Sequence, residues 1–308
     1  MKSSTGTGTT ATADSRPYRG RFAPSPTGRL HRGSLVAALA SYLDARAHSG
    51  TWLIRIEDLD AARKLPGVDQ SILDALASLH IRSDEPVVFQ SSRLERYTDA
   101  LNQLRAANLV YRCTCSRSET GGACSGRCRD LDDASPDKVA AEPAAWRLRF
   151  DAGDNLTFHD RVLGDLTYTC RDLGDPVVFR RDGVPAYQLA VVVDDAAQGV
   201  TDVVRGADLV DSTPWQIRIA EALGLRIPRF AHVPLVVEPD GSKLSKSRQS
   251  LPITGLDPAT TLLQTLRLLR QQPPAQLEGV APAAILDWAV RHWDVARLAG
   301  LRTVALPA

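Results

Sequence analysis

The sequence predicts an α/β fold built on a parallel sheet that an insertion interrupts. An apolar run at residues 18–22, a helical pattern that begins at Ser34 and an apolar run at 51–56 follow one another along the chain. This strand, helix and strand imply a parallel pair with a right-handed crossover. Between residues 146 and 169 apolar and polar residues alternate instead, which is typical of antiparallel strands, and strand signals then resume.

The composition is that of an ordinary globular protein. The chain has 308 residues, of which 44% are hydrophobic, enough for a full-sized core. Its net charge of +1 gives no overall attraction to nucleic acid or to an anionic membrane. No apolar run is long enough to span a bilayer, and residues 1–13 lack the apolar centre of a secretory signal. We therefore expect a cytoplasmic protein without a membrane partner.

The remaining elements follow from periodicity and from proline and glycine. Further helices are predicted at 68–79, 94–107 and 214–223. Strands are predicted at 176–179, 201–204 and 232–237, and C-terminal helices are separated by Gln-Gln-Pro-Pro at 271–274. The chain then divides into a disordered tail (1–17), the first half of a nucleotide-binding domain (18–112), an insertion with a metal site and antiparallel strands (113–169), the second half (170–250) and a helical C-terminal region (251–308).

A loop between the first strand and the first helix is suited to bind phosphate. Two prolines at 24 and 26 end the strand, and His31, Gly33 and Ser34 stand at the start of the helix. Unpaired backbone N–H groups and the helix dipole favour an anion there. His31 offers imidazole N–H donors, Gly33 lets a base or phosphate approach, and Ser34 is placed to cap the helix. By itself, the segment is equally well explained as a proline-rich loop.

A second polar loop follows the strand predicted at 232–237. Residues 240–247 read Asp-Gly-Ser-Lys-Leu-Ser-Lys-Ser, so Lys243 and Lys246 flank a serine. Lysines so placed neutralise charge on the α-phosphate and the leaving pyrophosphate while a carboxylate attacks, and one such contact is worth about 3 kcal/mol in a preorganised site. Alone, the loop is more often a solvated basic surface. Together the two loops predict ATP binding and activation of a carboxylate as an acyl-adenylate.

The two loops, in this order, resemble the two signature sequences of class I aminoacyl-tRNA synthetases. The resemblance implies a Rossmann-like catalytic domain in which His31, Lys243 and Lys246 are catalytic. It also implies that His31, Gly33, Ser34 and Lys246 bind ATP, which enters with Mg²⁺. Ser34 stands where the first signature commonly has a second histidine. His31 is therefore expected to be the single imidazole at the phosphates.

Further segments resemble the glutamyl-tRNA synthetase branch of this family. They are Arg-Phe-Ala-Pro-Ser-Pro-Thr-Gly at 21–28, Arg-Ile-Glu-Asp-Leu-Asp at 55–60, and the stretches 187–195 and 205–209. The likeness covers most of the chain, from residue 18 to 248. It implies that the substrate is L-glutamate and that the side chains or backbone that bind it belong to Arg21, Ala23, Ser25, Glu57, Tyr187 and Arg205.

These residue types suit an amino acid with two carboxylates and one ammonium group. Arg21 and Arg205 each offer a planar guanidinium to a carboxylate, Glu57 is a partner for ammonium, and Tyr187 offers a hydroxyl. Glutamine would leave one guanidinium partly unpaired. Each arginine taken singly is also explained by a surface ion pair, and Tyr187 by core packing. The sequence does not assign each carboxylate to one arginine.

The region after the lysine loop is too short for the anticodon-binding domain of a full glutamyl-tRNA synthetase, so we expect none. In this the chain resembles the shortened glutamyl-queuosine tRNA(Asp) synthetases. That resemblance implies transfer of glutamate to the queuosine base in the anticodon loop of tRNA(Asp), by a catalytic domain that itself faces the anticodon stem-loop. We also expect a monomer.

Four of the five cysteines stand close together, at Cys113, Cys115, Cys124 and Cys128. Four thiolates on a short glycine-rich hairpin suit a closed tetrahedral Zn²⁺ site, which is structural because no place is left for water. Free thiols are the alternative, and the family resemblance also favours zinc. Zinc binding would contribute about 10 kcal/mol or more to ordering the loop. Cys170 stands alone and is predicted to be a small buried apolar residue.

The predicted reaction has two steps. Glutamate attacks the α-phosphorus of Mg²⁺-bound ATP and releases pyrophosphate, and a hydroxyl of queuosine then captures the glutamyl-adenylate. Three alternatives stay open. They are a truncated glutamyl-tRNA synthetase that charges the 3′ end of tRNA(Glu), a small-molecule nucleotidyl transferase, and a non-catalytic zinc-bearing protein that binds RNA.

Overall fold

The computed structural model describes residues 16–116, 128–129, 143–150, 155–240, 253 and 255–306. Lys243, Lys246 and Cys124 lie outside the described residues, as does nearly all of the tail predicted at 1–17. Among the helices of the described ranges, none has the length and apolar character needed to cross a membrane.

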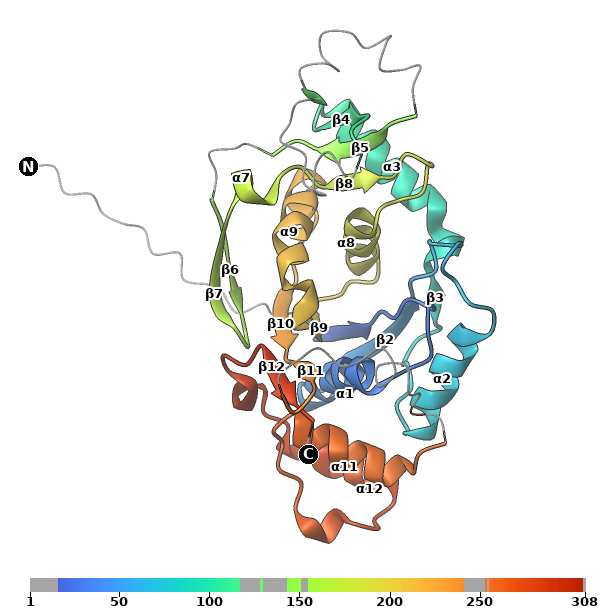
Figure 1. Cartoon of the computed structure of the whole chain (residues 1–308), viewed down its shortest axis with the longest axis vertical. Coiled ribbons are helices and arrows are strands. Elements are labelled where there is room, and N and C mark those ends of the chain that lie inside the picture. Colours follow the sequence, from blue (N-terminus) through green and yellow to red (C-terminus); the bar gives the residue numbers. More distant parts are fainter. Residues whose placement is uncertain are drawn as a thin grey trace, which may run out of the picture.

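The predicted parallel pair is present and forms the centre of the molecule (Figure 1). Strand β1 (Arg19–Phe22), helix α1 (Arg32–Ala47) and strand β2 (Thr51–Ile56) follow one another, and β1 pairs with β2 in parallel. Strand β3 (Val88–Phe89) extends this sheet beside β2. These elements confirm the first half of the predicted parallel sheet.

Strands from the second half of the chain continue on the other side of β1. Strand β9 (Asp202–Gly206) lies beside β1, where the amide of Thr201 donates to the carbonyl of Arg19 over 2.9 Å. Strand β10 (Arg229–Val233) pairs with β9 in parallel. The predicted strand at 201–204 is therefore confirmed, and its carboxyl end lies near that of β1.

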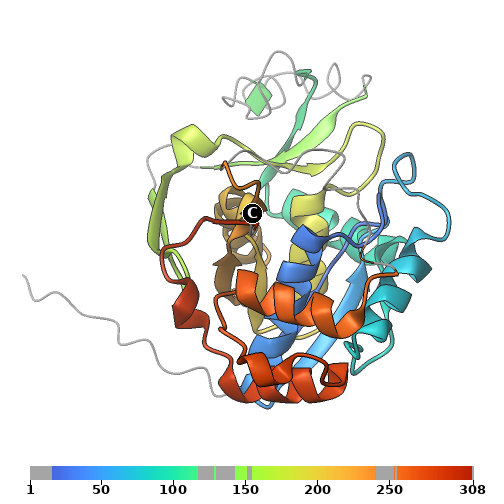
Figure 2. The same ribbon diagram turned by 60° about the horizontal axis from the view of Figure 1, so that its bottom comes forward.

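Helices cover both faces of these strands. Helix α1 packs on one face through the fully buried Leu35, Leu39 and Leu43, and α11 (Pro258–Leu268) and α12 (Pro282–His292) cover α1 (Figure 2). Helices α8 (Tyr187–Ala197) and α9 (Thr213–Ala222) lie on the opposite face (Figure 1). The helices predicted at 68–79 and 94–107 are α2 (Val68–Ser78) and α3 (Leu94–Ala106).

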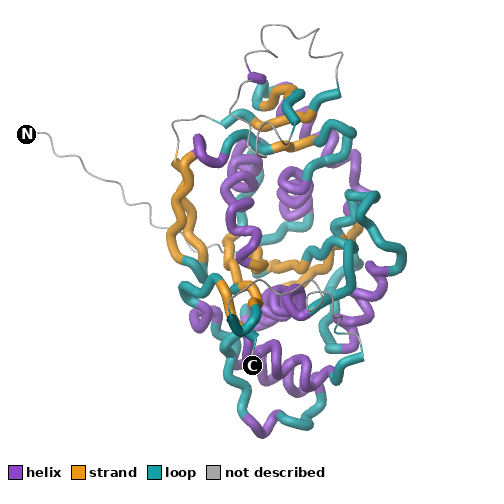
Figure 3. The backbone as a smooth tube through the Cα atoms, in the orientation of Figure 1, coloured by secondary structure: helices purple, strands orange, loops and turns teal. Residues whose placement is uncertain are grey.

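Two antiparallel parts lie in and beside the insertion predicted at 113–169. One is a sheet of β4 (Val110–Cys113), β5 (Ala145–Leu148) and β8 (Val177–Phe179), in which β5 is central. The other is the hairpin of β6 (Asn155–Asp160) and β7 (Gly164–Thr169), which joins β10 through a parallel contact of β6 (Figure 3).

Two strand predictions need correction. The strand at 176–179, expected with the parallel sheet, instead pairs antiparallel with β5. The strand predicted at 232–237 is divided at Pro234, which lacks an N–H, into β10 and β11 (Leu235–Val237). Strand β11 pairs in parallel with β12 (Thr303–Ala305), a strand that the helical prediction for the C-terminal region missed.

Short helices complete the described chain. They are α7 (Cys170–Leu173) and the 3₁₀ helices η1 (Gln90–Arg93), η2 (Ala207–Ser212), η3 (Ala275–Leu277) and η4 (Val295–Leu298).

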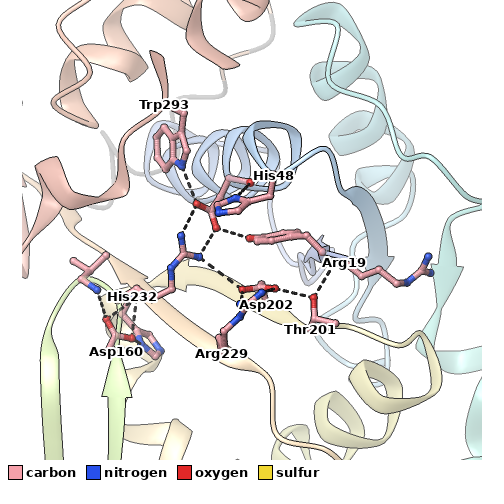
Figure 4. Close-up of polar contacts among 12 residues, drawn as sticks. Arg19, His48, Asp160, Thr201, Asp202, Arg229, His232 and Trp293 are labelled. Atoms are coloured by element: carbon pink, nitrogen blue, oxygen red, sulfur yellow. Dashed lines mark hydrogen bonds and ion pairs between the residues drawn. The ribbon is translucent and has the colours of Figure 1, made fainter. Parts of the chain in front are cut away.

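A buried carboxylate, Asp44 on α1, joins three distant segments. It accepts hydrogen bonds from the hydroxyl of Tyr18 at 2.5 Å, from both terminal nitrogens of Arg161 at 2.5 and 2.9 Å, and from the indole of Trp293 at 2.9 Å (Figure 4). Burial favours the neutral acid, but these donors outweigh it and hold the pKa of Asp44 below its usual value. The residues before β1, after β6 and after α12 are thereby fixed to α1.

Candidate active site

Two cavities meet at the carboxyl ends of the central strands. The smaller, of about 510 Å³, is lined by the turn after β1, by the end of β9 and by β11. The larger, of about 1360 Å³, extends from Glu57 toward β5, β8 and Cys115. Ser25 and Tyr187 line both cavities. The site is therefore a nucleotide-sized pocket that opens, past these two residues, into a wider chamber.

The turn after β1 has the predicted position but a different helix cap. His31, and not Ser34, is the N-cap of α1: its Nδ1 accepts from the amide of Ser34 at 3.3 Å, and its Nε2 lies 3.0 Å from the hydroxyl of Ser34. Since Nδ1 accepts, Nε2 carries the proton and donates to that hydroxyl. Burial lowers the pKa of His31, which favours this neutral form.

Gly33 has a steric reason to lack a side chain. A Cβ there would stand 3.3 Å from both Cε1 and Nδ1 of the His31 ring. A side chain at this position would therefore require the imidazole ring to shift by a few tenths of an ångström. His31, Gly33 and Ser34 all line the smaller cavity, so the structure brings the described part of the predicted ATP site together.

Arg21 is engaged by the protein itself. Its Nε and Nη2 donate to the two carboxylate oxygens of Asp195 at 3.1 and 3.2 Å, and both side chains are buried. Arg55 supports the same carboxylate, with Nη2 2.8 Å from Asp195 Oδ1. The Nε and Nη2 edge of the Arg21 guanidinium is therefore occupied by Asp195, and Arg21 also lines the smaller cavity.

Glu57 is a buried acid whose oxygen Oε1 makes no hydrogen bond within the described residues. Its nearest charged neighbour is Nη2 of Arg55, 3.6 Å from Oε1. Burial raises the pKa of Glu57 to about 7, although the charges of Arg55 and Arg21 favour ionisation. Glu57 lines the larger cavity, where a cationic ligand would satisfy it.

Arg205 is fully buried and is held only by neutral groups among the described residues. Its Nη1 donates to Gln216 at 2.8 Å, and its Nη2 donates to Thr213 at 2.8 Å. Its Nε donates to His232 at 3.0 Å. Burial lowers the pKa of Arg205. Arg205 thus presents a positive charge to the smaller cavity without a protein carboxylate to neutralise it.

Tyr187 and the backbone of the first turn complete the predicted amino-acid site. Tyr187 begins α8, is closely surrounded, and has a pKa raised by burial, so its hydroxyl keeps its proton. Ala23 and Ser25 line the smaller cavity beside it. All six predicted glutamate-binding residues therefore border these two joined cavities.

The segments that flank the lysine loop also lie at the smaller cavity. Val237 lines it, and the amide of Ile253 donates to the carbonyl of Leu30 in the first turn at 3.1 Å. Described residues on both sides of 241–252 thus lie at the turn after β1 or at the cavity that this turn lines. The positions of Lys243 and Lys246 themselves are outside the described residues.

Three of the four predicted metal-binding cysteines are described, and they lie together. The sulfur atoms of Cys113, Cys115 and Cys128 are all within 4.8 Å of one another, with Cys115 and Cys128 3.3 Å apart. Three converging thiols suit a thiophilic cation such as Zn²⁺. Cys170 is buried in another cluster, as predicted.

Sequence reasoning missed the residues that hold Arg21 and Arg205 in place. Arg55 and Asp195 were within recognised segments but were given no role, and His232 and Asp160 were not considered. One signal was available for Arg55, which interrupts an otherwise apolar strand and is fully buried there. A charged residue in a buried strand requires a partner, and this predicts an internal ion pair.

Comparison with known families agrees with this geometry. The family described as tRNA synthetases class I (E and Q), catalytic domain, matches residues 18–254. The chain is thus a class I tRNA synthetase of the E and Q family over the segment that contains the parallel strands and the turn after β1.

Individual relatives define the branch. A glutamyl-Q tRNA(Asp) synthetase of Pseudomonas fluorescens is 50% identical over 95% of this chain and 97% of its own length. One of Ectopseudomonas mendocina is 50% identical over 94% and 97%. The chain belongs to the glutamyl-Q tRNA(Asp) synthetase family.

Solved structures give the same fold. A glutamate tRNA ligase of Elizabethkingia meningosepticum, in complex with its amino acid, superimposes with a TM-score of 0.79 at 24% identity. A glutamate-tRNA synthetase of Elizabethkingia anophelis gives the same TM-score and identity. Each of the two matches includes 95% of this chain and 68% of the solved chain.

Proposed function

We propose that this protein activates L-glutamate with ATP and transfers the glutamyl group to the queuosine base of tRNA(Asp). The observation that carries the proposal is a pair of oppositely charged side chains at the joined cavities. Among the described residues Arg205 is held by neutral partners only, and Oε1 of Glu57 makes no hydrogen bond and lies 3.6 Å from Arg55. An amino acid with a second carboxylate matches both, because its carboxylate pairs with Arg205 and its ammonium with Glu57.

The neighbouring groups favour glutamate over glutamine. A carboxylate at Arg205 would be a charge-assisted acceptor, whereas an amide would place its NH₂ donors against a buried cation. The part of the Arg21 guanidinium that does not contact Asp195 is proposed to donate to the same carboxylate. Tyr187 is proposed to donate its protonated hydroxyl to the substrate. Arg205 is therefore proposed to take the side-chain carboxylate, with Arg21 in a supporting role.

ATP is proposed to occupy the smaller cavity with Mg²⁺. The N-terminus of α1 would receive its phosphates, with Gly33 and Ser34 beside it. His31 would donate its Nε2–H to a phosphate oxygen in place of the Ser34 hydroxyl, which lies 3.0 Å from that nitrogen in the structure. Lys243 and Lys246 would neutralise charge as pyrophosphate leaves. These groups position and stabilise charge, and no covalent intermediate with the protein is needed.

The larger cavity is proposed to receive the acceptor nucleoside. It reaches the smaller cavity past Ser25 and Tyr187, and its walls carry Arg180, Arg181 and Trp215, which suit phosphate and base contacts. A hydroxyl entering from this side would meet the carbonyl of the adenylate, form the ester and release AMP.

Zinc is proposed at Cys113, Cys115, Cys124 and Cys128. Bound there, it would order the insertion next to the larger cavity, which Cys115 lines, and would take no part in the chemistry. We also propose a cytoplasmic monomer, which size-exclusion chromatography with light scattering would test.

The experiment that tests the function has two stages. In the first stage, purified protein should catalyse glutamate-dependent exchange of labelled pyrophosphate into ATP without RNA. In the second stage, with labelled glutamate, it should transfer the label to tRNA(Asp) that contains queuosine but not to the same tRNA lacking it. Labelling of tRNA(Glu) at its 3′ end would instead favour the truncated glutamyl-tRNA synthetase. Exchange with other carboxylates would favour a nucleotidyl transferase, and RNA binding without exchange a non-catalytic protein.

A further inference from the structure

The contacts of Arg205 raise the question of what fixes its orientation. A buried arginine is usually oriented by a carboxylate, as Arg21 is by Asp195. Arg205 has instead an imidazole at Nε, an amide oxygen at Nη1 and, at Nη2, the Thr213 hydroxyl and the carbonyl of Leu209 at 3.3 Å. Two of these partners are themselves held by side chains: Gln216 donates to Gln188 at 2.9 Å, and His232 contacts Asp160. Of the two, only His232 is held by a carboxylate, and it also lies 3.2 Å from the Thr213 hydroxyl.

His232 stands on β10 and is completely buried, with Arg205 at one ring nitrogen and Asp160 at the other. Figure 4 shows His232 beside Asp160. Its Nε2 lies 3.0 Å from Nε of Arg205, and its Nδ1 lies 2.6 Å from Oδ2 of Asp160. Nε of an arginine always carries hydrogen, so Nε2 of His232 must accept. The single proton of the neutral ring is therefore on Nδ1, and it is donated to Asp160.

Asp160 is well fixed for this role. Its carboxylate accepts from the amides of Val162 and Leu163 at 3.0 and 2.9 Å, and from the amide of His232 at 3.2 Å. Burial opposes ionisation of Asp160, but the contacts with His232 and these amides lower its pKa to about 2. Asp160 thus stays a carboxylate and can only accept, which determines the tautomer of His232.

A neutral acceptor at this place has a different effect from a carboxylate. It orients the guanidinium through a directed hydrogen bond, but it leaves the positive charge of Arg205 available to a ligand. A carboxylate in contact with Nε would neutralise most of that charge in a site of low dielectric constant. Orientation and charge are therefore supplied by separate groups.

We propose that His232, fixed by Asp160, is a positioning residue that orients Arg205 toward the carboxylate of the amino-acid substrate. This inference rests on the proposed function of Arg205. Because Asp160 ends strand β6, the hairpin of the insertion contributes to the amino-acid site without touching the substrate.

The sharpest test is Asp160→Asn measured by pyrophosphate exchange. The NH₂ of asparagine would donate to Nδ1 and move the ring proton to Nε2, so that two donors face each other at Arg205. We expect the KM for glutamate to rise about 10-fold or more, as for loss of a hydrogen bond to a charged group, with the KM for ATP unchanged. His232→Asn, which keeps a donor for Asp160 but cannot reach Arg205, should behave similarly.

Two further variants separate positioning from general damage. His232→Gln, whose amide oxygen can still accept from Arg205, should recover part of the affinity for glutamate. Asp202→Asn is the matched control, because Asp202 is an equally buried carboxylate on the adjacent strand that binds Arg229 instead. It should leave the KM for glutamate unchanged, and thermal melting would verify that each variant is folded.

The proposal would be overturned by an unchanged KM for glutamate in folded Asp160→Asn and His232→Asn, or by equal rises in the KM for ATP and for glutamate. Nitrogen NMR of His232 in the wild-type protein gives a readout that needs no activity: a proton on Nε2 would also refute it. Absence of glutamate-dependent exchange in the wild type, with the proton on Nδ1, would count against the proposed function instead.

Discussion

Trp293 donates its indole N–H to the carboxylate of Asp44 across 249 positions of the chain. The same carboxylate binds Arg161 and Tyr18, so the C-terminal region and the insertion are both fastened to α1 (Figure 4). This buried group holds together parts of the protein that the parallel sheet alone would not connect.

Asp44→Asn should destabilise the protein by about 1–3 kcal/mol, because it removes the buried carboxylate shared by Tyr18, Arg161 and Trp293. Arg161 would keep only the more distant carboxylate of Asp202, at 3.8 Å. Urea unfolding followed by fluorescence measures the change. The control is Glu278→Gln, which removes the exposed pair with Arg267 and should cost well under about 1 kcal/mol. A loss in Asp44→Asn no larger than that of the control would refute the role given to Asp44.

Glu57 predicts opposite effects on binding and on stability. Its pKa is raised to about 7 by burial, so the folded protein holds a proton that the unfolded chain has already lost. Stability should therefore fall as the pH rises from about 5 to about 8, by up to about 3 kcal/mol for this group. Over the same range the KM for glutamate should fall, because the ionised form binds ammonium.

Glu57→Gln tests both effects in one variant. It should melt at a higher temperature than the wild type at about pH 8, with a smaller difference at about pH 5, and it should lose glutamate-dependent exchange. If the melting difference does not depend on pH, Glu57 is not the group that titrates.

Arg205→Lys keeps a positive charge but loses the planar fork and the contact with His232. We expect the KM for glutamate in pyrophosphate exchange to rise about 10- to 100-fold, with a smaller change in the KM for ATP. A larger effect on ATP than on glutamate would assign Arg205 to the nucleotide.

Gly33→Ala separates stability from catalysis. Alanine is favoured over glycine within a helix by about 1 kcal/mol, yet its Cβ would press on the His31 ring. We expect a folded protein with kcat for exchange reduced about 10-fold or more, as for loss of one charge-stabilising donor. Gly28→Ala, whose Cβ would meet nothing within 4 Å, is the control in the same cavity. Equal rates in the two variants would contradict the steric role of Gly33.

The cysteine cluster predicts one zinc ion per chain by elemental analysis of protein purified without chelator. Cys128→Ser should lose the metal, because Cys128 is one of the three gathered thiols. Cys170→Ala should keep it, since Cys170 packs in a separate apolar cluster. Metal-free wild type, or retention of zinc in Cys128→Ser, would disprove the site.

Local sequence patterns predicted much of the fold because period and helix-ending residues act over short distances. The strand, helix and strand at the start of the parallel sheet, and helices α2, α3 and α9, were predicted in this way. The assignment of 176–179 failed because a short apolar strand carries no information about its partner. Strand β12 was missed because Thr303–Ala305 pairs with a strand far away in the sequence.

The candidate site was predicted as a set of residues but not as a network. Charge type and position indicated Arg21, Glu57 and Arg205. Which of them a protein carboxylate already neutralises depends on contacts such as Arg21 with Asp195, 174 positions apart. Pairing of this kind is decided by tertiary packing and cannot be derived from local composition.

The parallel contact between β11 and β12 has a practical consequence. Val237 faces the nucleotide cavity, and its carbonyl accepts from the amide of Leu306. A tag or reporter fused close behind Leu306 could therefore disturb the strand that lines this cavity. The nucleotide affinity of such a fusion should be compared with that of a protein carrying the tag at the other end.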